Sequence, residues 1–321
     1  ERVTVGGFTA AHPSGIDNWI LNLQVWQETQ DENGVAIART EHYYDDQGFA
    51  AGNAGSVSAG NLTLTRSFID PAAGTFVNSV RNEYDGYGNV TGIYDPLGQT
   101  GNSAVGHYRE ILYDDVVYSH PLREIVHTAN PIPGAPQMVT LQADYDLGFG
   151  VVTASRDANG HQTSYEHDTF GRLVSIVKPG DTAASPTTAF DYVLAVPLPG
   201  DGLINYVETR QREEAGGGTI DSRAYSDGLG RKIMTRSEGE DPGQIVVTDT
   251  VQFNARRGLW KKYLPYFDAG GLAFVDPSFQ SGFIENHYDA QSRVLQAFQP
   301  LLEEAATREF SQFTYLPLGK L

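Results

Sequence analysis

The sequence predicts an all-β protein built as an array of antiparallel β-hairpins. Composition is the first reason, because 35 glycines and 17 tyrosines accompany frequent Asp, Asn, Val, Thr and Phe, the residues of strands joined by tight turns. The second reason is that the chain shows almost no helical periodicity. The third is a turn pattern, an aromatic residue followed by Asp-x-x-Gly, that recurs along the sequence.

The stretch HDTFGRLVSIVKPGDT, residues 167–182, shows this pattern and its physical basis. Asp168 can hydrogen-bond the backbone of its own turn, and Gly171 can adopt the positive φ that a Cβ makes costly. Arg172 follows, and a β-forming apolar run begins at Leu173. We expect the position before Asp, often aromatic, to pack against the neighbouring unit. Because each unit can bury a face only against its neighbours, the array must be continuous.

Copies of this turn occur along most of the chain. Strict copies begin at Tyr44, Tyr84 and Tyr94, near copies at Arg156, His167, Ser226, Phe267, Tyr288 and Tyr315, and stretched versions at Tyr145 and Phe253. Most separations between successive unstretched copies fall near multiples of ten or twenty residues, and about twenty residues make a strand, a turn and a return strand. The residues predicted to build the repeat turns are Tyr44, Asp45, Gly48, Tyr84, Asp85, Gly88, Tyr94, Asp95, Gly98, Asp157, Gly160, Asp168, Gly171, Arg172, Asp227, Gly230, Arg231, Tyr288 and Asp289.

Four segments outside these copies also carry predictions. WILNLQV (19–25) alternates apolar and polar residues, apart from Ile20, and predicts a strand. DENG (31–34) fails the spacing of an EF-hand loop and predicts a turn. GGFTAAHPSG (6–15) is rich in glycine but has neither a lysine nor a following helix, which indicates a plain loop. The best helix candidate is 301–308, which Pro300 opens.

Charge and cysteine content limit the classes of function. With 40 acidic and 22 basic residues the formal charge is −18, which disfavours binding to nucleic acid or to an anionic membrane surface. No apolar run is long enough to span a bilayer. The absence of cysteine rules out disulfides and thiolate chemistry and fits a large secreted or surface protein of bacteria. The chain begins at Glu1 without a signal-like segment, so we expect an interior piece of a longer protein.

The sequence predicts no catalytic, cofactor-binding or metal site. Its eight histidines are scattered and form no H-E-x-x-H motif, and nucleophile elbows, Walker loops and G-x-G-x-x-G turns are also missing. The group Glu41, His42, Asp45 and Asp46 would suit a hard cation if it folded together. A solvated strand end followed by a turn is the more common meaning of such a group.

Three other patterns have structural explanations. Glu238-Gly239-Glu240 matches the Glu-x-Glu of ADP-ribosyltransferases, but the Ser-Thr-Ser strand of that fold is missing, so an exposed loop is expected. The tyrosines at repeat positions would suit a sugar-stacking surface, yet packing between hairpins explains their placement better. The pair Lys261 and Lys262 is expected on an exposed strand face.

With these repeats the chain resembles the RHS/YD-repeat family. Within that family it is similar to the B component of bacterial insecticidal toxin complexes and to related Salmonella-virulence-type proteins. The resemblance is dense over about 80–301 and thin over 1–80, so we expect a β-rich lead-in segment at 1–80 and a repeat shell segment at 81–321. It is carried by DYDLGFGVVTASRDANGHQTSYEHDTFGRLVSIVKPGD (144–181), AYSDGLGRKIMTRSEGE (224–240), VQFNARRGLWKKYLPYF (251–267) and HYDAQSRVLQAFQPL (287–301). His167, Ser226, Ser292 and Leu316 depart from the family pattern.

The resemblance implies that the hairpins form part of a spiralling, hollow shell. In toxin complexes such a shell encloses a cytotoxic C-terminal segment. The leading expectation is therefore a non-enzymatic wall of a secreted shell that encapsulates and protects a toxin or other cargo polypeptide. Its expected partners are the remainder of a larger RHS polypeptide or a second shell subunit, and the cargo, which the acidic charge would favour if it is cationic.

Two alternatives stay open. The first is an extracellular adhesion or filament-forming YD-repeat protein, in which the same repeats present an outer face to sugars or partners. The second is a glycan-active enzyme, which would need paired carboxylates that converge in a cleft.

Overall fold

We describe a computed structural model of the chain, which covers residues 2–8, 23–45, 57–99, 101–102, 105–128, 138–198, 202–214, 217–277, 282–300 and 307–315. Every regular element among these residues is a β-strand, and the prediction of an all-β hairpin array is confirmed. Residues 19–22 of the predicted strand, Asp46, Gly48, Leu316 and nearly all of the helix candidate 301–308 lie outside the described residues.

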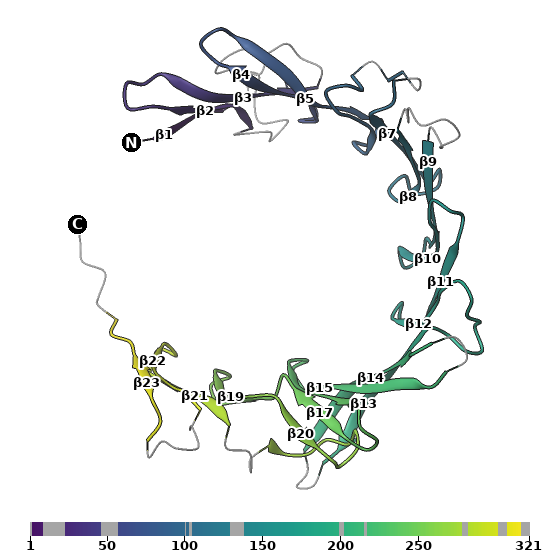
Figure 1. Cartoon of the computed structure of the whole chain (residues 1–321), viewed down its shortest axis with the longest axis vertical. Coiled ribbons are helices and arrows are strands. Elements are labelled where there is room, and N and C mark those ends of the chain that lie inside the picture. The colour runs from purple at the N-terminus through teal and green to yellow at the C-terminus, as the bar shows by residue number, and fades with distance from the viewer. Residues whose placement is uncertain are drawn as a thin grey trace. The chain divides into compact units, whose positions relative to one another are not determined.

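The chain divides into two compact units, residues 1–163 and 164–321. In unit 1, each strand pairs antiparallel with the next one along the chain, from the first strand to the tenth (Figure 1). These strands are β1 (Val3–Phe8), β2 (Gln24–Gln30), β3 (Ala36–Tyr44), β4 (Leu62–Asp70), β5 (Thr75–Tyr84), β6 (Val90–Tyr94), β7 (Tyr108–Tyr113), β8 (Pro121–His127), β9 (Met138–Asp146) and β10 (Val151–Arg156).

Unit 2 continues the same pairing from β11 to β17, with β20 next to β17. A separate five-stranded sheet follows the order β18-β19-β21-β22-β23. The strands are β11 (Gln162–His167), whose first residues precede the boundary, β12 (Leu173–Val177), β13 (Thr188–Pro197), β14 (Leu203–Arg212), β15 (Thr219–Ser226), β16 (Lys232–Glu238), β17 (Ile245–Thr248), β18 (Val251–Phe253), β19 (Leu259–Tyr263), β20 (Tyr266–Asp268), β21 (Phe283–Tyr288), β22 (Val294–Phe298) and β23 (Phe310–Gln312).

The apolar cores are small. In unit 2, Ile204, Tyr225, Met234, Ile245 and Val247 form a buried cluster, against which Leu272 and Phe274 pack. The cluster in unit 1 consists of Val25, Tyr44 and Val57. Hydrophobic burial in these clusters is therefore supplemented by contacts between side chains of neighbouring strands.

Arginines stacked on aromatic rings supply many of those contacts. The guanidinium of Arg66 lies 3.7 Å from the ring centroid of Phe76, and that of Arg81 lies 4.0 Å from Tyr94. Beyond Arg81 the stack continues through Tyr94 and Tyr108 to His127, with centroids 5.3 Å and then 4.0 Å apart. Such cation–π and stacking contacts cover a sheet face while they keep charge at its surface.

The prediction of a loop over 6–15 is wrong at its start, because Gly6, Gly7 and Phe8 belong to β1 and pair with β2. The physical reason lies at Gly7, where a Cβ would stand 2.2 Å from the indole nitrogen of Trp26. Glycine at this position leaves room for the indole on the strand, so here it marks a close side-chain approach rather than a loop.

Candidate functional site: the repeat turns

Seven turns share one hydrogen-bonding geometry. In each, the N–H of an Asp or Asn donates to the carbonyl of the residue four positions on, and its own carbonyl accepts from the residue three positions on. Its Oδ1 accepts the N–H groups two and four positions on, at 2.8–3.0 Å. The seven residues are Asp31, Asp85, Asp157, Asp168, Asp227, Asn254 and Asp289.

Each of these turns carries a positive φ at the residue three positions after the Asp or Asn. Five are glycines, with φ between 75° and 88°: Gly34, Gly88, Gly160, Gly171 and Gly230. Arg257 and Ser292 take the same position with φ of 68° and 63°. Ser292 thus departs from the sequence pattern without changing the turn, at the steric cost that a Cβ brings to this conformation.

In three of the turns an arginine side chain also bonds the carboxylate of the aspartate. In the turns of Asp168, Asp227 and Asp289, the arginine four positions on donates its Nε to Oδ2 at 2.7–2.8 Å. Burial alone would raise the pKa of Asp227, but the guanidinium and N–H of Arg231, with the N–H of Leu229, outweigh it and hold the pKa below its usual range. The charged carboxylate is therefore the form that the turn stabilises.

Asp45 uses a different glycine from the predicted Gly48. Its carboxylate accepts the backbone N–H groups of residues 58–61 at 2.8–3.1 Å, and its own N–H donates to the carbonyl of Asn61. Gly60 has a φ of 80° and takes the place that glycine holds in five of the seven turns. The chain between Asp45 and Ser58 is thus an insertion into a turn of the same frame.

The turn at Asp95 also differs from the seven turns of shared geometry. Asp95 Oδ1 accepts from Leu97 and Gly98, but the Asp95 N–H donates to the carbonyl of His107, twelve residues on. A Cβ on Gly98 would stand 2.0 Å from that carbonyl oxygen. Gly98 therefore permits close backbone approach in a longer connection, whereas the other glycines supply a positive φ.

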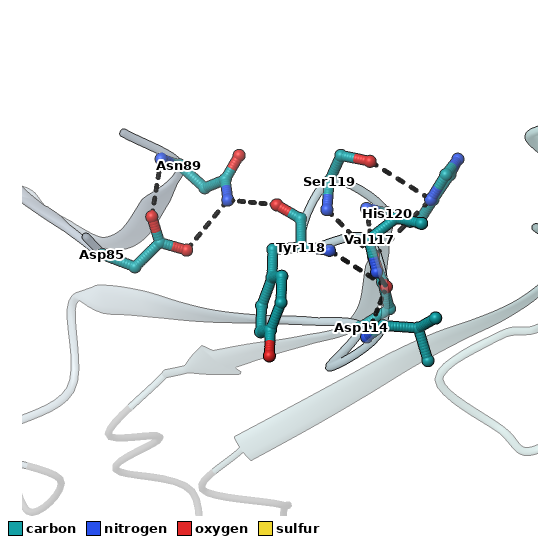
Figure 2. Close-up of polar contacts among 8 residues, drawn as sticks. Asp85, Asn89, Asp114, Val117, Tyr118, Ser119 and His120 are labelled. Atoms are coloured by element: carbon teal, nitrogen blue, oxygen red, sulfur yellow. Dashed lines mark hydrogen bonds and ion pairs between the residues drawn. The ribbon is translucent and has the colours of Figure 1, made fainter. Parts of the chain in front are cut away.

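A further turn, at Asp114, escaped the pattern search because it has no glycine. The side chain of Asp114 is 5% exposed and accepts the N–H groups of residues 116–120, several of which Figure 2 shows around it. Burial would raise its pKa, but these donors hold the pKa well below the usual range. Tyr118 takes the positive φ of 56°. In the sequence, the dipeptide Tyr113-Asp114 matches the start of the repeat pattern and could have indicated this turn.

The turns of Asp85 and Asp114 contact each other. Asn89 Nδ2 donates to Asp85 Oδ2 at 2.8 Å and to the carbonyl of Tyr118 at 2.6 Å, as Figure 2 shows. The rings of Tyr87 and Tyr118 stack with centroids 4.3 Å apart. Neighbouring turns are therefore connected by side chains as well as through the strands between them.

Ser119, His120 and Asp114 do not form a catalytic triad. Ser119 Oγ lies 3.4 Å and Asp114 Oδ2 3.6 Å from the same imidazole nitrogen, Nδ1 of His120 (Figure 2). A Ser-His-Asp relay needs the serine and the aspartate on opposite nitrogens. These residues belong to the turn instead.

Tyrosines at repeat positions bond the first residues of neighbouring strands. The hydroxyls of Tyr44, Tyr84 and Tyr288 donate to the carbonyls of Gln24, Leu62 and Leu259, each the first residue of a strand, at 2.6–2.9 Å. Asn82 and Asn286, two residues before the tyrosines of the last two pairs, donate to the same carbonyls at 3.0 Å. The sequence search missed these asparagines, for which the recurring Asn-x-Tyr-Asp was the signal.

Comparison with known proteins connects these turns to a family. A protein-family model described as RHS Repeat matches residues 145–183, a stretch that contains the turns of Asp157 and Asp168. This match covers 39 residues of the chain, so the likeness to the RHS repeat is local to that stretch. Among curated proteins, none matches it.

Solved structures share the fold of this chain. The crystal structure of TcdB2-TccC3 without the hypervariable C-terminal region matches with a TM-score of 0.62 at 10% identity, over 92% of this chain and 21% of that one. TcdB2-TccC3 itself matches with a TM-score of 0.60 at 12% identity, over 98% and 20%. The Photorhabdus luminescens Tc holotoxin pore matches with 0.57 at 10%, over 94% and 22%. The chain thus spans about a fifth of the length of the chains that it matches.

The other candidate residues of the chain have structural contacts. Glu41 is buried and accepts bonds from Arg39 and the Tyr43 hydroxyl. Glu238 accepts the N–H of Asp221 at the end of β16, and the ammonium of Lys261 lies 4.3 Å from the ring centroids of Trp260 and Phe283. Within the described part of the chain, no three His, Cys, Asp or Glu side chains form a metal-binding group. No helix of the described residues is long and apolar enough to cross a membrane.

Proposed function

We propose that this chain is a non-enzymatic wall segment of a secreted, hollow RHS shell that encloses and protects a cargo polypeptide. The observation that carries the proposal is the pairing of consecutive strands, from β1 to β10 in unit 1 and from β11 to β17 in unit 2, with turns of one geometry at several strand ends. The fold likeness to TcdB2-TccC3 over nearly the whole chain supports it.

The physics of the turns suits a wall. A sheet of hairpins resists opening only if its strand ends are held, because fraying starts where backbone groups lack partners. Each Asp carboxylate takes up N–H groups that the turn itself leaves unpaired, and the repeat tyrosines Tyr44, Tyr84 and Tyr288 each take up the first carbonyl of a neighbouring strand. The turn residues named above are thus proposed as structural determinants of the wall, with no part in chemistry.

The remaining parts of the proposal concern the whole protein. Residues 1–80 would form a lead-in to the repeat shell at 81–321, and the wall would be completed by further RHS polypeptide or by a second subunit. TcdB2-TccC3, whose name joins two components, supports a partner of this kind.

Peptide mapping of the native, full-length particle tests this function. Intact particles and particles opened by mild denaturant are digested with a protease, and the released peptides are identified by mass spectrometry. We expect a C-terminal fragment that co-purifies with the wall and resists cleavage until the particle is opened. A continuous chain whose peptides all appear at one rate would contradict enclosure and favour the adhesion or filament role.

A further inference from the structure

The turns on one side of the array carry large exposed apolar residues. In unit 1, antiparallel pairing brings the connections that follow β5, β7 and β9 to the same strand ends, and their tips are Tyr87, Val116 and Phe149, with 67%, 65% and 54% of their surface exposed. At the opposite ends, the described tips Asn33 and Asn159 are polar, whereas Leu97 and the pair Ala72 and Ala73 are apolar. Exposed apolar rows of this kind mark interaction surfaces.

Unit 2 presents a similar row. Phe170 and Leu229 occupy the equivalent tips of the turns at Asp168 and Asp227 and are 76% and 58% exposed. The turns at Asn254 and Asp289 carry Arg256 and Gln291 at that position instead. Both units therefore offer apolar tips, but the residues around them differ in charge.

The two rows carry opposite charge. We call residues 85–89, 114–120 and 146–150 the acidic turn row, which contains four aspartates and neither Lys nor Arg. Residues 168–172, 227–231, 254–258 and 289–293 are the basic turn row, which contains five arginines against three aspartates. Asp115 in the first row and Arg256 and Arg257 in the second are exposed.

Contacts along each row hold the turns in place. Besides the Asn89 bond and the Tyr87–Tyr118 stack, the ring of His120 lies 4.9 Å from that of Tyr145 in the acidic turn row. In the basic turn row, Arg231 donates to the carbonyl of Arg257, and Arg256 to that of Asp289, both at 3.3 Å. Surfaces ordered before binding lose less entropy when they associate.

We propose that the acidic turn row of one copy of this chain binds the basic turn row of a second copy. A chain of charge −18 repels its copies over most of its surface, so the basic turn row is where an acidic surface is attracted. The tips of the acidic turn row follow alternate connections and lie two strands, or roughly 10 Å, apart, whereas Phe170 and Leu229 follow β11 and β15 and lie four strands, or roughly 20 Å, apart. The longer interval leaves room for a tip of the acidic turn row between the two tips of unit 2, and every copy carries both rows.

Disulfide trapping tests which rows meet. The chain has no cysteine, so single substitutions report without background. Val116→Cys and Leu229→Cys chains are mixed in equal amounts and oxidised gently, and the products are separated by mass. We expect the mixed V116C–L229C dimer to exceed its statistical share. Asn159→Cys, at the opposite strand ends, is the matched control and is expected to stay monomeric. Dominant like-with-like dimers, or trapping as efficient with N159C, would overturn the proposal.

Charge reversal gives a second measurement, by sedimentation over a range of concentrations. Arg257→Glu is expected to raise the dissociation constant about tenfold or more, because it places like charges together. Asp115→Arg on the other chain is expected to restore binding to Arg257→Glu, and added salt to weaken the wild-type complex. Unchanged association in R257E, or no rescue by D115R, would refute the pairing of rows. The test does not depend on an enclosed cargo and so is distinct from that of the shell.

Discussion

The contribution of a repeat turn can be separated into two parts at Asp227. Asp227→Ala removes the acceptor for the N–H groups of Leu229 and Arg231, each at 3.0 Å, and the partner of the Arg231 guanidinium. Asp227→Asn keeps the acceptor for the two N–H groups and removes the charge together with Oδ2, the acceptor of the Arg231 guanidinium. Asn254 shows that an amide can serve, because its Oδ1 accepts the N–H groups of Arg256 and Gly258 at 2.9 Å in the same geometry.

The expected costs follow from these contacts. Hydrogen bonds to a charged group contribute about 1.5–3 kcal/mol each, and the lower end applies here because the Asp227 side chain is 24% exposed and water can replace part of the loss. We therefore expect Asp227→Ala to lower the free energy of unfolding by about 3 kcal/mol. Asp227→Asn keeps the two backbone bonds and loses a partly exposed ion pair, for which about 1 kcal/mol is expected.

Thermal and urea unfolding of the whole chain, followed by circular dichroism, measure both variants. A domain of 150–250 residues shifts its Tm by about 2–4 °C per kcal/mol, so Asp227→Ala should lower the Tm by roughly 6–12 °C and Asp227→Asn by roughly 2–4 °C. Equal losses in the two variants would show that the ion pair carries the whole effect. Losses below 1 kcal/mol in both would refute the view that these turns hold the strand ends.

Three further predictions use the same unfolding measurements. Asp268→Asn should cost about 3 kcal/mol, because it leaves the fully buried guanidinium of Arg236 without its counter-charge at 2.6 Å, and a smaller cost than that of a surface ion pair would contradict the buried pairing. Gly230→Ala should lower the free energy of unfolding by about 1–2 kcal/mol, because the φ of Gly230 is 75° and a Cβ is strained there although no atom lies near it. Gly228→Ala is the control and should leave stability unchanged, because Gly228 has equal space but no positive φ. Equal effects of the two substitutions would exclude a backbone origin. Acid should destabilise the array: the pKa values of Asp85, Asp168, Asp227 and Asp289 lie below their unfolded value of about 3.9, so their contribution is present above that pH and is lost as pH falls through the folded pKa. A stability that is flat from pH 6 to pH 3 would contradict this.

The fold class and the repeat were predictable because the turn chemistry is local. Asp168, Gly171 and Arg172 lie within five residues of each other, and every hydrogen bond that defines their turn joins members of that stretch. Composition and alternation then suffice to place strands on either side. DENG was predicted as a turn by the same reasoning, and Asp31 adopts the geometry of the other repeat turns although no aromatic residue precedes it.

Positions that depend on distant residues could not be read from the pattern. Gly60 replaces the predicted Gly48 because the carboxylate of Asp45 closes an inserted loop by itself, which needs no fixed number of residues between them. Asp114 closes a seven-residue turn in the same way, and Tyr118 supplies the positive φ. The carboxylate and its backbone donors therefore define these turns, while glycine lowers their cost where the turn is short.

The aromatic residue of the motif has a separate role, which its placement in unit 1 reveals. Turns after β3, β5, β7 and β9 follow a Tyr-Asp pair, whereas the turns of Asp31 and Asp157, at the opposite strand ends, follow Gln and Arg. Because the tyrosine hydroxyl reaches the first carbonyl of a neighbouring strand, it is useful only at the ends where that strand begins. One aromatic copy is thus expected for every two strands, which accounts for repeat separations near twenty or forty residues. Tyr94 is the exception within unit 1, and its hydroxyl donates to the carboxylate of Glu83 instead of a carbonyl. A Tyr-Asp pair at the opposite strand ends therefore indicates a longer connection, as at Asp95, rather than another closing hairpin.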